Sequence, residues 1–164
     1  MISTKQVTKT AAFIALAVML GYVESLFPPL VAGVKLGLAN SVVITVIYTQ
    51  GNRQAWVVSL LKVILCMALF GSMTSFIYSL TGAVVSLTVM LLAKKSRLFS
   101  LVAVSSLGGL FHNLAQLVCA YFIIGKGALL HLPVLCLSGL LCGVLTGLAA
   151  QIIIKRGRDI FGKE

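Results

Sequence analysis

Lys62 lies in the middle of a long apolar run, SLLKVILCMALF, and is the most chemically informative residue of this sequence. An ionised amine is costly at the centre of a membrane, where it needs an anion, a carbonyl or water as a partner. The side chain is therefore expected to face the interior of a helix bundle or a cavity. Two interpretations remain open: Lys62 contacts a ligand, or it has a structural role, either paired with Glu24 or extended toward the membrane interface.

A second group of polar residues lies in the later apolar run GGLFHNLAQLVCAY. His112 and Gln116 are four residues apart, so a helix places both on one stripe with Asn113 beside them. Any one of these side chains alone is typical of hydrogen bonding between membrane helices. The three together, with a lysine in another apolar run, favour a polar cavity.

The same inventory argues against catalysis and metal binding. The chain has only three acids, and it shows no carboxylate pair, nucleophile with a base, aspartate-rich diphosphate site or glycine-rich phosphate loop. The two histidines, His112 and His131, stand near no thiol or carboxylate pattern. The cysteines lack CxxC spacing and are predicted to be small core residues: Cys66, Cys119, Cys136 and Cys142. We expect a protein that is not an enzyme and has no metal or cofactor.

The elements that must position these side chains are predicted to be membrane helices. Hydrophobic residues make up 60% of the 164 positions, charged residues make up 10%, and the mean hydropathy is +1.12. About a quarter of a soluble domain is charged, so we expect an all-α integral membrane protein with one membrane domain, residues 1–164. Six spans are predicted, at 11–28, 36–50, 54–71, 75–93, 98–124 and 132–154. The second is short and the fifth long, and the segment 27–37 is predicted to fold back over the outer face as a cap.

The basic residues predict the orientation. With the N-terminus in the cytoplasm, the outer loops hold only Lys35 and Lys126. The cytoplasmic segments then collect Lys5, Lys9, Arg53, Lys94, Lys95, Arg97, Lys155, Arg156, Arg158 and Lys163. This asymmetry predicts that both termini are cytoplasmic. It also explains the net charge of +10 through contact with the cytoplasm and anionic membrane lipid, so no nucleic-acid partner is expected.

Small residues recur at helical spacing in two of the spans. Gly139, Gly143 and Gly147 follow one another at four-residue intervals in the sixth span, and Ala11 and Ala15 do so in the first. Membrane helices approach closely where such residues face a neighbour. Ordinary packing within the bundle is the interpretation we favour for the glycines.

Four stretches carry a resemblance to a known family: TKTAAFIALAVML, GVKLGLANSVVITVIYTQG, FGSMTSFIYSLTGAVVSLTVMLL and GGLFHNLAQLVCAYF. Over nearly its whole length the chain resembles the family known as Gx transporter or heptaprenyl diphosphate synthase component I. This family in turn resembles the S components of energy-coupling factor (ECF) transporters. The resemblance implies a six-helix bundle in a bacterial plasma membrane that binds a vitamin, metal or related small molecule from outside for uptake. Its partners would be a membrane T component and cytoplasmic ATPase subunits, which supply the energy. The basic and amide groups, with few acids, indicate an anionic or strongly hydrogen-bonding ligand.

The resemblance also implies roles for particular residues. An AxxxA motif in the first helix is the usual docking surface for the T component, and here it falls on Ala11 and Ala15. The ligand would lie toward the outer face, under the loop before the second helix. The substrate-binding residues implied there are Lys35, Asn40, Lys62, Tyr78, His112, Asn113 and Gln116.

Two other functions remain open. The family's second name suggests a non-catalytic membrane accessory subunit in the synthesis of heptaprenyl diphosphate or a quinone precursor. A self-contained channel or secondary carrier is disfavoured because the chain has few acids to couple transport to protons or sodium.

Overall fold

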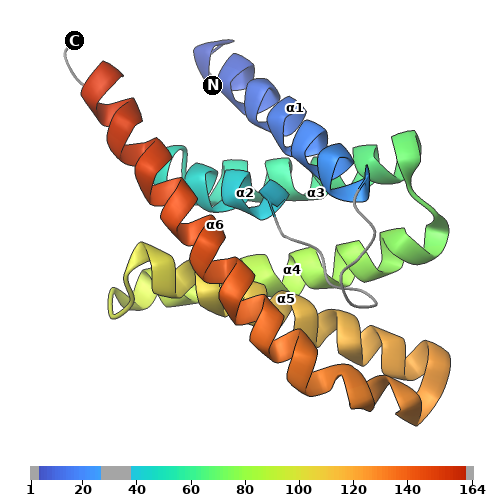
Figure 1. The fold of residues 1–164 in the computed structure, drawn as a ribbon. Helices are drawn as coiled ribbons and strands as arrows, with labels where there is room; N and C mark the ends of the chain where they lie inside the picture. Colours follow the sequence, from blue (N-terminus) through green and yellow to red (C-terminus); the bar gives the residue numbers. More distant parts are fainter. Residues whose placement is uncertain (1–3, 27–37, 162–164) are drawn as a thin grey trace.

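The computed structural model describes residues 4–26 and 38–161, and the regular structure within these ranges is helical. The elements are α1 (Thr4–Leu26), α2 (Leu38–Thr49), α3 (Asn52–Phe70), α4 (Met73–Ser96), α5 (Leu101–Ile124), the 3-10 helix η1 (Gly125–His131) and α6 (Leu132–Phe161). Figure 1 shows α5 and α6 as an antiparallel hairpin that reverses direction at η1. The cap predicted for residues 27–37 lies outside the described residues.

Four stretches are long and apolar enough to cross a membrane: Thr4–Leu26, Asn52–Phe70, Met73–Ser96 and Leu101–Arg156. The last of them contains both arms of the α5–α6 hairpin. The prediction of an all-α protein that crosses the membrane several times is therefore confirmed by helix length and hydropathy.

The fifth helix ends where the predicted span 98–124 ends but begins three residues later. Helix α5 has 24 residues and begins at Leu101, because the Ser100 side chain caps it by accepting a hydrogen bond from the Ala103 backbone N–H at 3.2 Å. Residues 98–100 belong instead to the connection from α4, which turns at Arg97 with a φ of 57°. Apolar residues in this short connection made it look like part of the helix.

Helix α2 is short but is the most enclosed element. Its 12 residues extend about 18 Å, less than the roughly 30 Å of a bilayer's hydrocarbon core. Every side chain from 41 to 47 is buried, and those of Ile44, Val46 and Ile47 are fully so. A helix that buries side chains on all its faces belongs in the interior, and α2 accordingly packs against α1, α3 and α6.

Glycines bring α5 and α6 into backbone contact. A methyl group added to Gly139 would lie 2.6 Å from the carbonyl oxygen of Gly109, and one added to Gly143 would lie 2.6 Å from Cα of Ser106. The prediction that these glycines serve helix packing is confirmed. The Ser105 and Thr146 hydroxyls meet at 3.1 Å across the same contact. The Ser86 hydroxyl of α4 donates to the Gly108 carbonyl of α5 at 2.8 Å, so α4, α5 and α6 form one closely joined unit.

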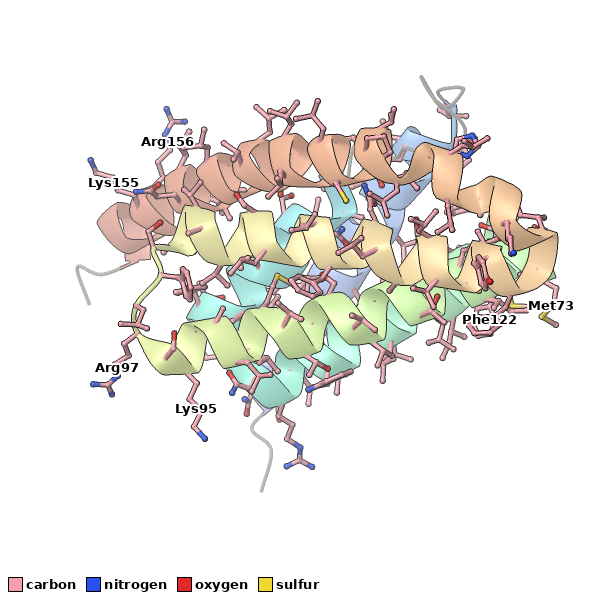
Figure 2. The ribbon with its side chains drawn as sticks, turned by 90° about the horizontal axis from the view of Figure 1, so that it is seen from below. Met73, Lys95, Arg97, Phe122, Lys155 and Arg156 are labelled. Atoms are coloured by element: carbon pink, nitrogen blue, oxygen red, sulfur yellow. The ribbon has the colours of Figure 1, made fainter. Side chains whose placement is uncertain are left out.

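The two ends of the bundle differ in character. Figure 2 shows Lys95, Arg97, Lys155 and Arg156 at one end and Met73 and Phe122 at the other. The end of α2 also lies at the basic end, because Lys94 in the last turn of α4 donates to the Ile47 carbonyl. The bundle therefore has one strongly basic end, which is the asymmetry expected of a membrane protein.

Candidate binding cavity

A cavity of about 170 Å³ lies inside the bundle and is lined by residues of all six α-helices. On α1, α2 and α3 the lining residues lie in the half of the helix nearest Met73 and Phe122, and on α4, α5 and α6 they extend further, to Met90, Ser105 and Thr146. The cavity therefore lies mostly in the half of the bundle that holds Met73 and Phe122 and reaches deeper past its middle. Its charged, amide, imidazole and hydroxyl-bearing residues in this half are Glu24, Ser25, Asn40, Lys62, Ser75, Ser79, His112, Asn113 and Gln116.

Lys62 contributes the amine of the cavity wall. Its Nζ donates a hydrogen bond to Asn40 Oδ1 at 3.1 Å, which joins the middle of α3 to the first turn of α2. Glu24, the sequence-predicted alternative partner, lines the same cavity from α1. The prediction that Lys62 faces the bundle interior or a cavity is confirmed, and both groups are placed where a ligand could contact them.

His112 and Gln116 form a local pair on α5. Their Nε2 atoms lie 3.1 Å apart across one helical turn. The imidazole also packs on α4, where a methyl group added to Gly82 would lie 2.7 Å from the ring carbon Cε1. The absence of a side chain at position 82 makes room for the ring, and packing and hydrogen bonding together fix its position.

Asn113 joins helices in addition to lining the cavity. It is only 9% exposed, and its Nδ2 donates to the Leu135 carbonyl at 2.9 Å and to the Ser138 hydroxyl at 3.3 Å. These contacts connect α5 to the first turns of α6. The predicted polar stripe therefore has two parts, a pair held within α5 and an amide that holds the hairpin together.

The remaining predicted residues lie elsewhere. Tyr78 is half-buried on α4 but is not among the described residues that line the cavity. Ser75, Phe76 and Ser79 line it instead. Lys35 lies outside the described residues. The serines could have been found from the sequence, since two hydroxyls one helical turn apart in an apolar run are typical of a buried polar face.

Several lining residues were not predicted from the sequence. Glu24 had been considered only as a structural partner, and its neighbour Ser25 was not singled out. Phe70, Phe76, Cys66 and Cys142 add apolar and weakly polar surface, and all four cysteines of the chain are half-buried. Nothing in their sequence spacing distinguishes these residues from other apolar positions.

Ala11 and Ala15 are both exposed on the outer face of α1, one helical turn apart. Ala17, on another side of the same helix, is fully buried. The two small residues therefore face lipid or a neighbouring protein and not the interior of the bundle.

In the described part of the chain, the cavity wall provides one amine, one carboxyl group, an imidazole, amides and hydroxyls. These groups can hold a polar molecule by charge and hydrogen bonds. Within the described ranges, no three His, Cys, Asp or Glu side chains gather as a possible metal site.

The long apolar helices define the chain as a polytopic membrane protein, and a cavity with several polar side chains in its wall lies among them. The model of one family, heptaprenyl diphosphate synthase component I, matches residues 13–153, which is most of the chain and includes every described lining residue. The chain belongs to this family. Searches of the curated proteins and of the solved structures found no match to the chain.

Proposed function

We propose that this protein is the substrate-binding component of an ECF-type uptake transporter and that it acts by binding and not by catalysis. The observation that carries the proposal is the cavity inside the bundle with Lys62, His112 and Gln116 in its walls. Such side chains are expensive inside a membrane and are typical of a substrate site or pathway. Their cargo would be a small anionic or vitamin-related molecule.

The cavity dimensions limit the size of this molecule. An apolar cavity of about 150 Å³ accepts benzene. About 170 Å³ therefore accommodates a group comparable to a single ring with a few substituents. Lys62 would supply positive charge for the ligand, and His112 with Gln116 would orient it through hydrogen bonds.

The basic end of the bundle supports an uptake orientation. Anionic head groups and the positive-inside rule favour the end with Lys95, Arg97, Lys155 and Arg156 on the cytoplasmic side. The start of α1 and the end of α6 would then be cytoplasmic, and the helices would make six crossings of a bacterial plasma membrane. The cavity, displaced toward the opposite end, would receive its ligand from outside the cell.

Energy would come from partner subunits. Ala11 and Ala15 lie exposed in the first half of α1, near the proposed cytoplasmic side. Small exposed residues one turn apart allow another helix to approach closely. We propose that a membrane T component docks there and connects the protein to cytoplasmic ATPase subunits.

Native mass spectrometry of the protein, gently purified from its own host, tests the proposal. We expect a retained small molecule, associated T-component and ATPase subunits, and loss of the small molecule in Lys62→Met. Lys126→Met is the matched control, because Lys126 is an exposed lysine of η1 outside the cavity. A Lys62→Met protein that retains its cargo at the wild-type level would falsify the assignment.

The family's name favours a second candidate, a membrane accessory subunit in heptaprenyl diphosphate synthesis. In that role the protein would present a prenyl or quinone precursor to a soluble synthase. The cavity is too small to enclose a chain of seven isoprene units, so such a chain would have to lie outside it. Co-purification with a prenyl synthase, in place of a T component, is the result expected from this alternative.

A further inference from the structure

An apolar groove adjoins the cavity on the outer surface of the bundle. It lies between α1 and the end of α3 and has a volume of about 360 Å³. It is lined by Val18, Met19, Tyr22, Val23, Leu69 and Phe70. The cavity is rich in polar groups, whereas this groove is bordered almost entirely by hydrocarbon and aromatic side chains.

Phe70 lines both the cavity and the groove and so stands at their boundary. Its ring contacts Tyr22 of α1 edge to face, with 5.4 Å between the ring centroids. The two helices also meet at Gly21, where an added methyl group would lie 3.0 Å from Cys66 Sγ. Side chains of α1 and α3 therefore separate the cavity from the groove near Phe70. Side-chain rotation can open such a boundary without separating the helices.

The end of α3 leaves room for that rotation. Phe70 is the last helical residue, and Gly71 continues in an extended conformation, with φ of −95° and ψ of 174°. No further turn of α3 covers the Phe70 ring, which is 36% exposed. Tyr22 is also exposed, at 49%. The ring pair thus lies between the cavity and the lipid-facing side of the protein.

We infer that the ligand is an amphiphile whose small polar head lies in the cavity and whose single apolar tail passes between Tyr22 and Phe70 into the groove. This inference rests on the proposed binding function and specifies its substrate class. Among the described residues, the cavity walls contain one lysine and one glutamate, so a head group with at most one net negative charge is better matched than a diphosphate. The polar head would then lie among polar side chains in the cavity, and the apolar tail would lie among apolar side chains in the groove.

The groove need not increase the affinity for the tail. Lipid is as apolar as the groove, so moving a hydrocarbon chain from lipid into it yields little hydrophobic free energy. The groove instead allows the tail to leave the cavity, so that the tail does not have to lie among polar groups. The position of the tail, and its dependence on the head group, are therefore more informative than total affinity.

Photolabelling tests this arrangement in protein reconstituted into lipid nanodiscs. The probe is a medium-chain carboxylate with a diazirine at the end of its tail, and the head-group competitor is propionate. We expect labelled peptides that contain Met19, Val23 or Leu69, with labelling reduced about tenfold by saturating propionate and by Lys62→Met. Propionate binding itself is measured separately by saturation-transfer NMR.

A pair of tryptophan variants controls for nonspecific contact. Val23→Trp fills the groove and should abolish tail labelling while propionate still binds. Leu16→Trp should change neither result, because Leu16 is a similarly exposed α1 residue outside the groove, 44% against 39% for Val23.

The outcomes separate this inference from the proposed function. Groove labelling that ignores both propionate and Lys62→Met would identify the groove as an ordinary lipid contact and overturn the inference. Labelling away from the groove would do the same. In either case, propionate binding that requires Lys62 would leave the proposed function intact. If propionate and the probe both fail to bind wild-type protein, the anionic binding site and the inference built on it are both wrong.

Discussion

Lys62 Nζ lies 3.1 Å from Asn40 Oδ1, and this hydrogen bond joins α3 to the first turn of α2 at the wall of the cavity. The two residues are 22 positions apart in the sequence. An amide oxygen accepts a hydrogen bond from an amine and so restricts where the amine lies. The pair therefore fixes the position of the Lys62 amine at the cavity wall.

Asn40→Leu should weaken ligand binding without preventing folding. Loss of the amide oxygen leaves Lys62 less well oriented, and one hydrogen bond to a charged group is worth about 1.5–3 kcal/mol, or roughly tenfold or more in affinity. Titration of the purified protein with its identified cargo measures the effect. Wild-type affinity in Asn40→Leu would show that the amide does not position the amine.

Asn113 and Gln116 should differ in what their loss affects. Asn113→Leu removes hydrogen bonds to Leu135 and Ser138 and should lower stability by about 1 kcal/mol. Gln116→Leu breaks the hydrogen bond with His112 on the same helix and should mainly lower ligand affinity. Thermal denaturation in detergent and ligand titration of both variants separate the two effects. Equal losses of stability would contradict this division.

Gly143→Ala should destabilise the α5–α6 hairpin. The added methyl group would lie 2.6 Å from Cα of Ser106 and 2.7 Å from the Ser105 carbonyl oxygen, so the helices must separate. Overpacking of this kind costs about 1–3 kcal/mol. Gly127→Ala is the matched control, because its methyl group would meet nothing within 4 Å in the described structure. Thermal midpoints in detergent should fall for the first variant and stay near wild type for the second.

Replacing both Ala11 and Ala15 by leucine should disrupt association with the proposed T component while cargo binding persists. The larger side chains would prevent close approach of a partner helix to the exposed face of α1. Ala149→Leu is the control, because Ala149 is an exposed alanine of α6. Pull-down of partner subunits, followed by mass spectrometry, measures the association. An intact complex in the double variant would place the docking surface elsewhere.

Much of the fold could be predicted because membrane helices depend on local sequence properties. A long apolar run must satisfy its own backbone hydrogen bonds within lipid, so its composition predicts a helix. The helix starts were less predictable. Ser100 ends the α4–α5 connection through a side-chain hydrogen bond, and hydropathy does not detect such a cap. The short second span was recognised, but its enclosure on all sides became apparent only from the packing of α2.

For the polar residues, too, the sequence indicated some properties, whereas others depended on the tertiary structure. Their types alone indicated that Lys62, His112, Asn113 and Gln116 should avoid lipid. Their different partners could not be predicted, because Asn40, Gly82 and Leu135 belong to other helices. Tyr78 shows what the sequence could not predict. A tyrosine in an apolar run can face a cavity, a neighbouring helix or lipid, and in the fold Tyr78 is not among the described residues of the cavity wall.

The sequence by itself determined that this chain forms apolar membrane helices and that a few polar side chains must face inward, because lipid penalises exposed backbone and charge wherever they occur. Only the tertiary structure decided which of those side chains share a cavity and which join helices. It also placed Phe70 between that cavity and an apolar groove. These relationships depend on how separate helices pack, and no single segment carries that information.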